Sequence, residues 1–478
     1  MNEVTEFGTA VLAVSAAVFV ALLGMRLADR LAVPYAAIFL VGAVVLGEVV
    51  PAAEQLLSTK EVERIAVVAL MVILFHGGLH IGLRRFRQAV GPILALGIVG
   101  TFLTAAIVAL AARYLLGFSW IEAGLIGAAV APTDPAVTFS VFGAREVRGR
   151  SGTILEGEAG MNDPVGIALM IGMIELATAD EGTLAIVVEE FAIQMVLGLA
   201  VGVAGAFALL PAMRHIRLAS PALYPIRVLA GAGVIYGLAA ITGGSGFLAV
   251  FVAGILLGDL AAPRKGEIEG FHASLAGLAE IAAFVALGLS IAISDLSKLG
   301  VWEDGLALAI ILAFVARPLA VGSLLLPARL RFGERLFVVW GGLKGAVPIL
   351  LGALAVLAGV EEAERLYGIV FVVVLFSVTV QGATIPLVAQ KLRVPFRLID
   401  HDLAEVVEFV VRDDAFARGR RLGELPLGER AWVGVLIRDG RPRPVGGGVV
   451  LEAGDRVHVY CQPEDSAALE RLFAGTSE

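Results

Sequence analysis

Three carboxylates lie in two stretches of the chain that are otherwise apolar enough to cross a bilayer. Asp134 lies in APTDPAVTFS, and Glu158 and Asp163 lie in GEAGMNDPVGIALM. A carboxylate at membrane depth is costly unless it is paired or faces a water-filled cavity, so an acid there is a functional-site hypothesis by default. A single carboxylate can hold either a proton or a metal cation. The three acids therefore indicate an ion carrier that exchanges a cation for protons, and we do not expect an enzyme.

Glu158 and Asp163 are expected to have separate partners. On a helix, five residues turn by about 500°, so the two side chains diverge by roughly 140°. Only Arg317 and Lys344 are basic and lie well inside the later apolar segments. A buried arginine keeps its proton and needs a fixed carboxylate. We therefore pair Glu158 with Arg317 as a structural ion pair that braces the bundle, which leaves Asp163 to bind the cation or the proton.

Thr133-Asp134-Pro135 is expected to interrupt a membrane span. Proline lacks a backbone donor and disfavours helix at the residue before it. Secondary transporters place ion sites at broken helices, where freed carbonyls and helix ends can bind the ion. An alternative is that Pro135 only kinks the helix and Asp134 caps the half-helix that follows, and the two roles can coexist.

Lys344 is the one further basic residue that could neutralise Asp163. Its neighbours Gly345 and Pro348 predict a helix end near the cytoplasmic side. We therefore expect Lys344 to be an accessory residue.

The composition is that of a membrane protein built from many helices. Hydrophobic residues make up 58% of the 478 residues and charged residues 17%, against roughly 25% charged in soluble domains. The mean hydropathy is +0.90, and the 57 glycines fit membrane helices, in which glycine is frequent. The single cysteine, Cys461, excludes an internal disulfide framework and fits a reducing, cytoplasmic setting. The N-terminal MNEVTEF lacks the basic segment of a cleavable signal peptide, so we expect the first apolar run to be a retained span.

Apolar windows of roughly 17–25 residues predict thirteen membrane spans. They are residues 7–25, 33–50, 62–82, 90–114, 119–142, 157–177, 187–211, 224–241, 244–258, 277–293, 303–327, 334–357 and 364–390. Nineteen lysines and arginines lie in or at the edges of the odd-numbered connections and in the start of the tail, up to Arg397, against five in or at the edges of the even-numbered connections. By the positive-inside rule, the N-terminus is outside and the C-terminus is in the cytoplasm. We expect the protein in the cell inner (plasma) membrane, in contact with lipid.

The second half of the chain echoes the first. Pro318 follows Arg317 in the eleventh span, as Pro135 follows Asp134 in the fifth. The two spans are six apart. We interpret this as two six-helix units that repeat in inverted topology, with one span outside the repeat.

The composition of the sequence changes from about residue 400. Charged residues become more frequent, and strand patterns of alternating polar and apolar residues appear between turn residues. AWVGVLIRD and DRVHVYCQ predict strands, GGGVVLEAGDRVHVY predicts strand, turn and strand, and SAALERLFAG predicts a closing helix. We therefore divide the chain into a transmembrane domain over residues 1–395 and a small cytoplasmic α+β domain over residues 401–478. The second domain has neither a nucleotide-binding glycine motif nor zinc-ligand spacing.

Taken together, TDPAVTFSVF, GEAGMNDPVG, the ARP of the eleventh span and WGGLKGAVPI resemble the cation:proton antiporter family of the NhaP and sodium/proton exchanger kind. The resemblance covers essentially all of residues 7–390, and it implies an all-α, NhaA-like fold of thirteen helices and a homodimer. It places Asp163 as the acid that binds the ion or the proton, with Asn162 beside it. Asp134 and the carbonyl of Thr133 would be further ligands of a monovalent cation. An Asn-Asp pair, instead of two adjacent aspartates, implies electroneutral one-for-one exchange.

The C-terminal domain resembles the regulatory RCK/TrkA-C domain of potassium-uptake proteins and potassium channels, through VVRDDAFARGRRLGELPL and VVLEAGDRVHVYCQPED. Bacterial NhaP-like antiporters with such a domain are associated with potassium/proton exchange, which favours K⁺ and places Na⁺ next. The small size of the domain indicates a small regulatory ligand or a dimer contact. We expect no cofactor and no nucleic-acid partner.

Three positions depart from the family pattern. His76 stands where many relatives have an acid in the third span, and a histidine can titrate near neutral pH. It is either an accessory residue that senses pH or holds water, or a histidine that is hydrogen-bonded to a backbone carbonyl. Ala159 stands where relatives often have serine, which removes a hydroxyl ligand, and Lys344 replaces an arginine.

The leading hypothesis is a secondary transporter that exchanges K⁺, or else Na⁺, for H⁺ as Asp163 is exposed to the two sides in turn. The alternative is a ligand-gated potassium channel controlled by the C-terminal domain, although the sequence lacks a TVGYG-type filter. A membrane-anchored sensor whose spans are only a scaffold is a third hypothesis.

Overall fold

A computed structural model of the chain describes most of its residues. They are residues 33–49, 58–134, 137–138, 145–147, 149–179, 182–259, 264–291, 296–297, 300–398, 405–427, 431–461 and 463–474, with positions 8, 12, 15, 19 and 22–24. The chain divides into two compact units, Met1–Arg397 and Leu398–Glu478. Most of the first predicted span, residues 7–25, and Pro135 lie outside the described residues.

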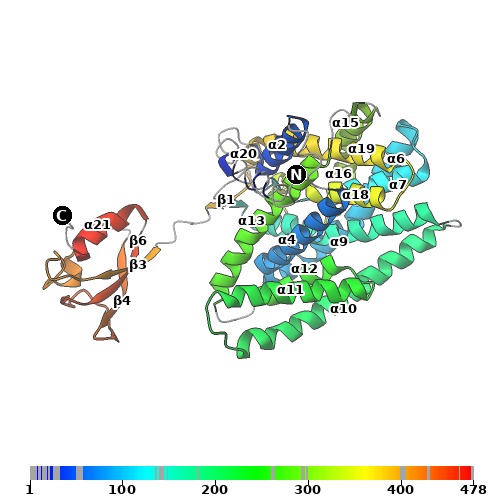
Figure 1. Ribbon diagram of the computed structural model, residues 1–478. Coiled ribbons are helices and arrows are strands. Elements are labelled where there is room, and N and C mark those ends of the chain that lie inside the picture. The colour runs from blue at the N-terminus through cyan, green and yellow to red at the C-terminus, as the bar shows by residue number, and fades with distance from the viewer. Residues whose placement is uncertain are drawn as a thin grey trace. The chain divides into compact units, whose positions relative to one another are not determined.

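The first unit is built from helices (Figure 1). In chain order they are α2 (Tyr35–Val49), α4 (Thr59–Gln88), α5 (Val90–Leu94), η1 (Ala95–Gly100), α6 (Thr101–Leu115), α7 (Trp120–Val130), α9 (Arg150–Thr178), α10 (Leu184–His215), α11 (Leu223–Ile241), α12 (Gly246–Gly258), α13 (Lys265–Leu289), α15 (Val301–Ile311), η2 (Leu312–Ala316), α16 (Arg317–Leu324), α17 (Phe332–Gly341), α18 (Ala346–Leu357), α19 (Ala363–Phe376), η3 (Ser377–Gln381) and α20 (Gly382–Lys391). Two short strands, β1 (Arg145–Val147) and β2 (Phe396–Leu398), pair with each other.

Seven of the described helices are long and apolar enough to cross a membrane, and four more are apolar but shorter. With α9 and α17, they correspond in order to the second to thirteenth predicted spans. Local sequence signals set several of their ends. Ser58 and Glu61 form a capping box at the start of α4, as Ser119 and Glu122 do at the start of α7, so each pair satisfies backbone donors that the first helical turn leaves free.

Two of the described membrane spans are interrupted by non-helical segments, and α4 has a kink at Gly82. In the fifth, α7 ends at Val130 and the chain is not helical at residues 132–134, as the Thr133-Asp134-Pro135 sequence predicts. The twelfth, predicted as one span over residues 334–357, consists instead of α17 and α18, separated by Gly342–Gly345. Pro348 is the third residue of α18, where a helix has no backbone acceptor for an N–H, so the proline fits there without strain.

The predicted match between the fifth and eleventh spans is wrong. The eleventh span runs unbroken through Arg317 and Pro318, from α15 through the π-helical η2 into α16. The interrupted spans are the fifth and the twelfth, which are seven apart. Successive spans alternate in direction, so only an odd offset relates two units of inverted topology, and an offset of six would leave them parallel. Among the described spans, the second to sixth thus correspond to the ninth to thirteenth, on either side of α10, the seventh span.

Other features repeat at the same offset of seven. The fourth and eleventh spans each contain a π-helical segment, η1 and η2. The second and ninth spans are the short helices α2 and α12, of 15 and 13 residues. These matches support an offset of seven spans between the two repeated units.

The second unit is a small α+β fold (Figure 1). Its elements are β3 (Glu405–Val410), the 3₁₀ turn η4 (Leu422–Glu424), β4 (Trp432–Arg438), β5 (Arg441–Arg443), β6 (Arg456–Cys461) and α21 (Pro463–Ala474). The strands form an antiparallel sheet in the order β3-β6-β4-β5. One face of the sheet and α21 share a core that includes Phe409, Val457 and Phe473.

The predicted class, the strands β4 and β6 and the closing helix are confirmed, and one strand prediction is wrong. The segment around Gly446–Leu451 is not a strand; Val450 makes only an isolated bridge with Arg421. β6 pairs with β4 along one edge and with β3 along the other, where Val407 lies opposite Val459. The three glycines of GGGVV turn the chain, and Val449 N–H donates to the carbonyl of Gly446.

A buried carboxylate ties β4 to the turn before β6. Asp455 is 1% exposed and accepts two hydrogen bonds from the guanidinium of Arg438, each 2.7 Å long. It also accepts from the backbone N–H of Glu452 at 2.8 Å. Burial by itself would raise the pKa of Asp455, but these hydrogen bonds outweigh it and hold the pKa below its usual value.

Asp455→Asn is expected to destabilise the second unit near neutral pH by about 1–3 kcal/mol, the scale of hydrogen bonds to a charged group. Because folding lowers the pKa of Asp455, its stabilising effect is complete above the ordinary value of about 4 and is lost as the pH falls through the lowered value. Amide hydrogen exchange of β4 and β6 in the full-length protein measures this. The variant should exchange faster at pH 7, and its difference from wild type should shrink below about pH 4.

Asp413→Asn is the matched control, because the Asp413–Arg418 ion pair is largely exposed and such pairs contribute little. Equal protection of the wild type and Asp455→Asn at pH 7 would contradict the role of Asp455.

Candidate functional site

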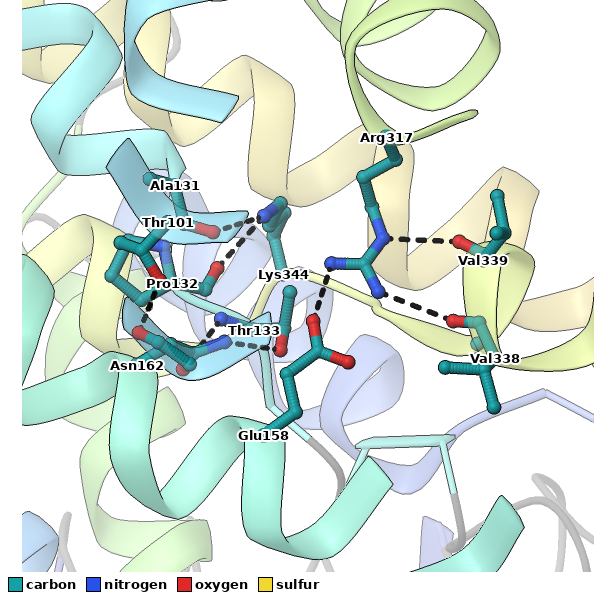
Figure 2. Close-up of polar contacts among 12 residues, drawn as sticks. Thr101, Ala131, Pro132, Thr133, Glu158, Asn162, Arg317, Val338, Val339 and Lys344 are labelled. Atoms are coloured by element: carbon teal, nitrogen blue, oxygen red, sulfur yellow. Dashed lines mark hydrogen bonds and ion pairs between the residues drawn. The ribbon is translucent and has the colours of Figure 1, made fainter. Parts of the chain in front are cut away.

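The two interrupted spans lie against each other at their breaks (Figure 2). The backbone N–H of Asp134 donates to the carbonyl of Leu343 at 2.8 Å. The ammonium group of Lys344 donates to the carbonyls of Ala131 and Pro132, at 2.8 and 2.9 Å. These carbonyls follow the last turn of α7, where the helix dipole is negative, so a cation is stabilised there. Each break thus supplies a partner that the other lacks.

The last four carbonyls of α17 also have partners, although no helical turn follows to use them. Those of Val338 and Val339 accept from Arg317, at 3.2 and 3.0 Å. Those of Trp340 and Gly341 accept from the side chains of Gln381 and Thr138. The carbonyls at the C-terminal end of α17 are therefore all hydrogen-bonded, so the helix can end inside the bundle.

Glu158 and Arg317 form a buried ion pair, with 3.0 Å between Arg317 Nη1 and Glu158 Oε1. Both side chains are almost completely buried. Arg317 is held on its other sides by the two α17 carbonyls, so all three of its nitrogens are bonded (Figure 2). Gly342 lets the chain pass this close, since a Cβ at that position would lie 1.9 Å from the guanidinium carbon. The geometry matches the predicted structural ion pair.

Asn162 connects the sixth span to the break of the fifth. Its side-chain amide donates to Thr133 Oγ1 at 2.8 Å, and its carbonyl oxygen accepts from the backbone N–H of Thr133 at 3.3 Å. Both residues are buried. Asn162 therefore fixes the non-helical segment that carries Asp134.

Asp163 differs from Glu158, the other buried acid of α9, because it makes no ion pair with the described residues. Glu158 Oε2 also lacks a hydrogen-bond partner there, but Glu158 Oε1 is paired with Arg317. Asp163 is 5% exposed, and its Oδ1 is buried without a hydrogen-bond partner in the part of the chain that the structure describes. The charged groups that act most strongly on it are Asp134 and Lys344. Since no direct ion pair fixes this oxygen among the described residues, it is available to a proton or a cation.

Asp134 lies against the start of α18. A Cβ on Gly345 would come within 2.0 Å of Asp134 Oδ2, so the backbone approaches the carboxylate as only glycine allows. Gly345 directly precedes the N-terminal end of α18, which favours negative charge. The two breaks thus place a cationic and an anionic side chain at helix ends of the opposite sign.

The predicted location of Lys344 near the cytoplasmic side is wrong. Lys344 is 1% exposed and lies in the break itself. Gly345 and Pro348 do mark a helix end, but this end is internal, because α17 stops inside the bundle on the other side of the break. An ammonium group beside two carbonyls of the break in the fifth span contributes directly to the charge of the site.

His76 lies on α4, half-buried, and its Nδ1 has no hydrogen-bond partner among the described residues. Its ring is 6.2 Å from that of His80, centroid to centroid. The carbonyl hydrogen bond considered for it is therefore not made by Nδ1. A different histidine, His272 of α13, makes such a bond to the carbonyl of Ile268.

Sequence reasoning missed Glu280. The tenth span was expected to begin at residue 277, which puts Glu280 at its edge, whereas α13 begins at Lys265 and carries Glu280 well inside. Its Oε1 is buried and unpartnered within the described residues, and the charge of Asp134 acts on it. A search for acids in the longest helix that the apolar pattern allows would have found it.

The two breaks offer oxygen ligands to a cation. The described residues contain no group of three or more His, Cys, Asp or Glu side chains that could hold a metal ion. The carboxylates of Asp134 and Asp163 and the oxygens of Thr133 are hard oxygen ligands. Such ligands can bind a cation and release it again.

Comparisons with known proteins match both units to known families. Residues 15–391 match the transmembrane part of the sodium/hydrogen exchangers, and residues 406–474 match the TrkA-C domain. The K(+)/H(+) antiporter NhaP2 of Shewanella sp. (strain ANA-3) is 32% identical over 94% of this chain and 80% of its own length. The K(+)/H(+) antiporter NhaP of Alkalimonas amylolytica is 30% identical over 98% and 83%.

Among solved structures, the sodium proton antiporter MjNhaP1 from Methanocaldococcus jannaschii superposes with a TM-score of 0.68. It is 23% identical to the chain, and the match covers 79% of this chain and 99% of that one. The likeness supports the predicted NhaA-like helical fold of the first unit.

Arg317→Ala is expected to prevent stable folding. It leaves Glu158 as a buried, unpaired charge and frees two carbonyls of α17, and breaking a buried pair in this way costs about 3–5 kcal/mol. Arg317→Lys should restore little of the lost stability, because an ammonium group cannot reproduce the three hydrogen bonds that the planar guanidinium donates. The yield of monodisperse protein in detergent and its melting temperature measure the effect.

Arg365→Ala serves as the control, because its ion pair with Asp304 is partly exposed and its loss should have a smaller effect. An Arg317→Ala protein as stable as the wild type would overturn the assignment of this pair as a structural lock.

Proposed function

The chain belongs to the sodium/hydrogen exchanger family, and we propose that it exchanges K⁺ for H⁺ by competition of the two ions for Asp163. Membership of this family favours cation/proton exchange over the ligand-gated channel and the anchored sensor considered from the sequence. The choice of K⁺ over Na⁺ is supported by relatives that are named K(+)/H(+) antiporters and align over nearly the whole chain, C-terminal domain included.

One observation carries the proposal for the site. Asp163 is a buried carboxylate with an unpartnered oxygen, beside Asp134, where two broken spans cross. In the empty state, an ionised carboxylate so placed is costly. A proton or a dehydrated cation removes that cost, and the two cannot occupy the same oxygen together. Competition of a proton and a cation for this one carboxylate is sufficient to couple their transport in opposite directions.

The charges around the site support one-for-one exchange. Arg317 neutralises Glu158, and Lys344 offsets one of the two carboxylates of Asp134 and Asp163. We assign Glu280 as a neutral carboxylic acid, because it has no counter-charge among the described residues. One negative charge then remains, which either one K⁺ or one proton balances, so the loaded carrier is neutral in both states.

The residues around Asp163 take supporting roles in this proposal. Asp134 and the carbonyl of Thr133 act as further ligands of the cation, and Asn162 holds Thr133 in place. Lys344 is accessory as a fixed counter-charge. His76, which lacks a partner for Nδ1 within the described residues, is assigned as an accessory residue that holds water.

The setting of the protein follows from the charge pattern of the connections. We place it in the inner (plasma) membrane with the N-terminus outside and the TrkA-C domain in the cytoplasm. We further propose a homodimer, and a small molecule as the ligand through which the C-terminal domain regulates transport. No cofactor is needed for exchange driven by ion gradients.

Asp163→Asn should abolish exchange, because an amide can neither release a proton nor balance a cation. The measurement is proton flux in proteoliposomes with a preset pH gradient, after addition of K⁺, Na⁺, Li⁺ or Rb⁺ in turn. Wild type should dissipate the gradient most effectively with K⁺ and without generating a voltage.

Glu175→Gln is the matched control, because it removes an exposed acid from the end of the same helix, α9, and should leave exchange intact. Full exchange by Asp163→Asn would refute competition at this residue. A preference for Na⁺ by the wild type would refute the assignment of K⁺ and leave exchange standing.

A further inference from the structure

The thirteenth span holds both sides of the break in the twelfth. The backbone N–H of Lys344 donates to Ser377 Oγ at 2.9 Å, and Ser377 Oγ in turn donates to Gln381 Oε1 at 3.3 Å. The amide of Gln381 donates to the carbonyl of Trp340 at 2.7 Å. A chain of three hydrogen bonds therefore runs from the end of α17 to the residue before Gly345.

These two side chains come from an irregular stretch of the span. Ser377 and Gln381 are the first and last residues of the π-helical η3 and are 2% and 5% exposed. Single π turns inside α-helices are rare and are frequently found at functional sites. Polar side chains inside a membrane bundle are costly unless they have partners, and here each has one at the break.

The first unit contains the same arrangement. Asn162, on the sixth span, bonds the backbone N–H and the hydroxyl of Thr133 in the break of the fifth. The sixth and thirteenth spans are seven apart, the offset that relates the two units. In each unit, a polar side chain on the last span thus accepts a backbone N–H from the broken span before it.

We infer that Ser377 and Gln381 are positioning residues for ion binding, the counterpart in the second unit of Asn162 in the first. They act through the break and do not touch the ion. The segment that they hold contains Leu343, whose carbonyl accepts from Asp134 N–H, and Gly345, which lies against the Asp134 carboxylate. The inference rests on the proposed function in one respect, that Asp134 is a ligand of the cation.

This geometry separates positioning from simple bracing. Loss of the hydrogen-bond chain frees the segment over residues 341–345 and lets the Asp134 carboxylate leave its place beside Asp163. Cation affinity should fall, while Asp163 still carries the proton. A residue that only braced the bundle would change the amount of folded protein and the maximal rate, and it would leave the cation affinity of the surviving protein unchanged.

The test compares the apparent KM for the transported cation and the maximal rate of Ser377→Ala, Ser377→Thr and Gln381→Leu in proteoliposomes. We expect Ser377→Ala and Gln381→Leu to raise the KM by about five- to tenfold, the effect of one lost buried hydrogen bond, with a much smaller change in maximal rate per folded protein. Ser377→Thr keeps the hydroxyl and should keep the KM near that of wild type.

Thr379→Val is the matched control. Thr379 lies in the same π-helical segment, but its hydroxyl donates to the carbonyl of Leu375 within its own helix. A KM raised equally by Thr379→Val, or left unchanged by both Ser377→Ala and Gln381→Leu, would overturn the inference. If Ser377→Ala does not fold, Gln381→Leu tests the same hydrogen-bond chain from its other end.

The wild type separates this inference from the proposed function. If it transports no cation in exchange for protons, the proposed function fails. If it does, and neither variant changes the KM, only the positioning role fails.

Discussion

The structure depends on a constraint of the bilayer: a backbone N–H or carbonyl that a broken helix exposes must find its partner within the protein. The chain meets this constraint by crossing its two broken spans. Lys344 donates to carbonyls that follow α7, Asp134 N–H donates to the carbonyl of Leu343, and Arg317 occupies two carbonyls at the end of α17. The proposed ion site lies where the backbone groups of the two breaks find these partners.

The same crossing explains why the buried charges divide into fixed and free groups. Arg317 is bonded through all three nitrogens and fixes Glu158. Lys344 is fixed by two carbonyls. Asp163 has a buried oxygen for which the described residues supply no partner, and unlike Glu158 it makes no ion pair with them. A rigid frame around this carboxylate lets a proton and a cation compete for it without rearranging the rest.

Much of this site could be predicted from residue types. The acids of GEAGMNDPVG, the break at Thr133-Asp134-Pro135 and the partner of Glu158 follow from the cost of charge in a membrane and from the chemistry of arginine and proline. The break at Gly342–Gly345 did not follow, because glycines and a proline give the same local signal at the end of a span and in its middle. Only the crossing of the two spans distinguishes the two cases.

The other differences have similar causes. Glu280 was missed because apolar patterns fix the existence of a span better than its ends, and α13 starts twelve residues before the predicted boundary at residue 277. In the C-terminal unit, β3 pairs with β6 across 46 residues or more, and no local signal in β3 indicates that partner. The types of element could be predicted from the sequence, but the contacts between distant segments could not.

The central claim is that K⁺ and a proton exclude each other at Asp163, and proton release on K⁺ binding tests it most directly. Purified protein in a weakly buffered detergent solution near neutral pH would receive K⁺ while a pH-sensitive dye records the protons set free. The account predicts release of about one proton per chain as K⁺ saturates the site, because a cation displaces the proton from its ligand. K⁺ binding without proton release would contradict it.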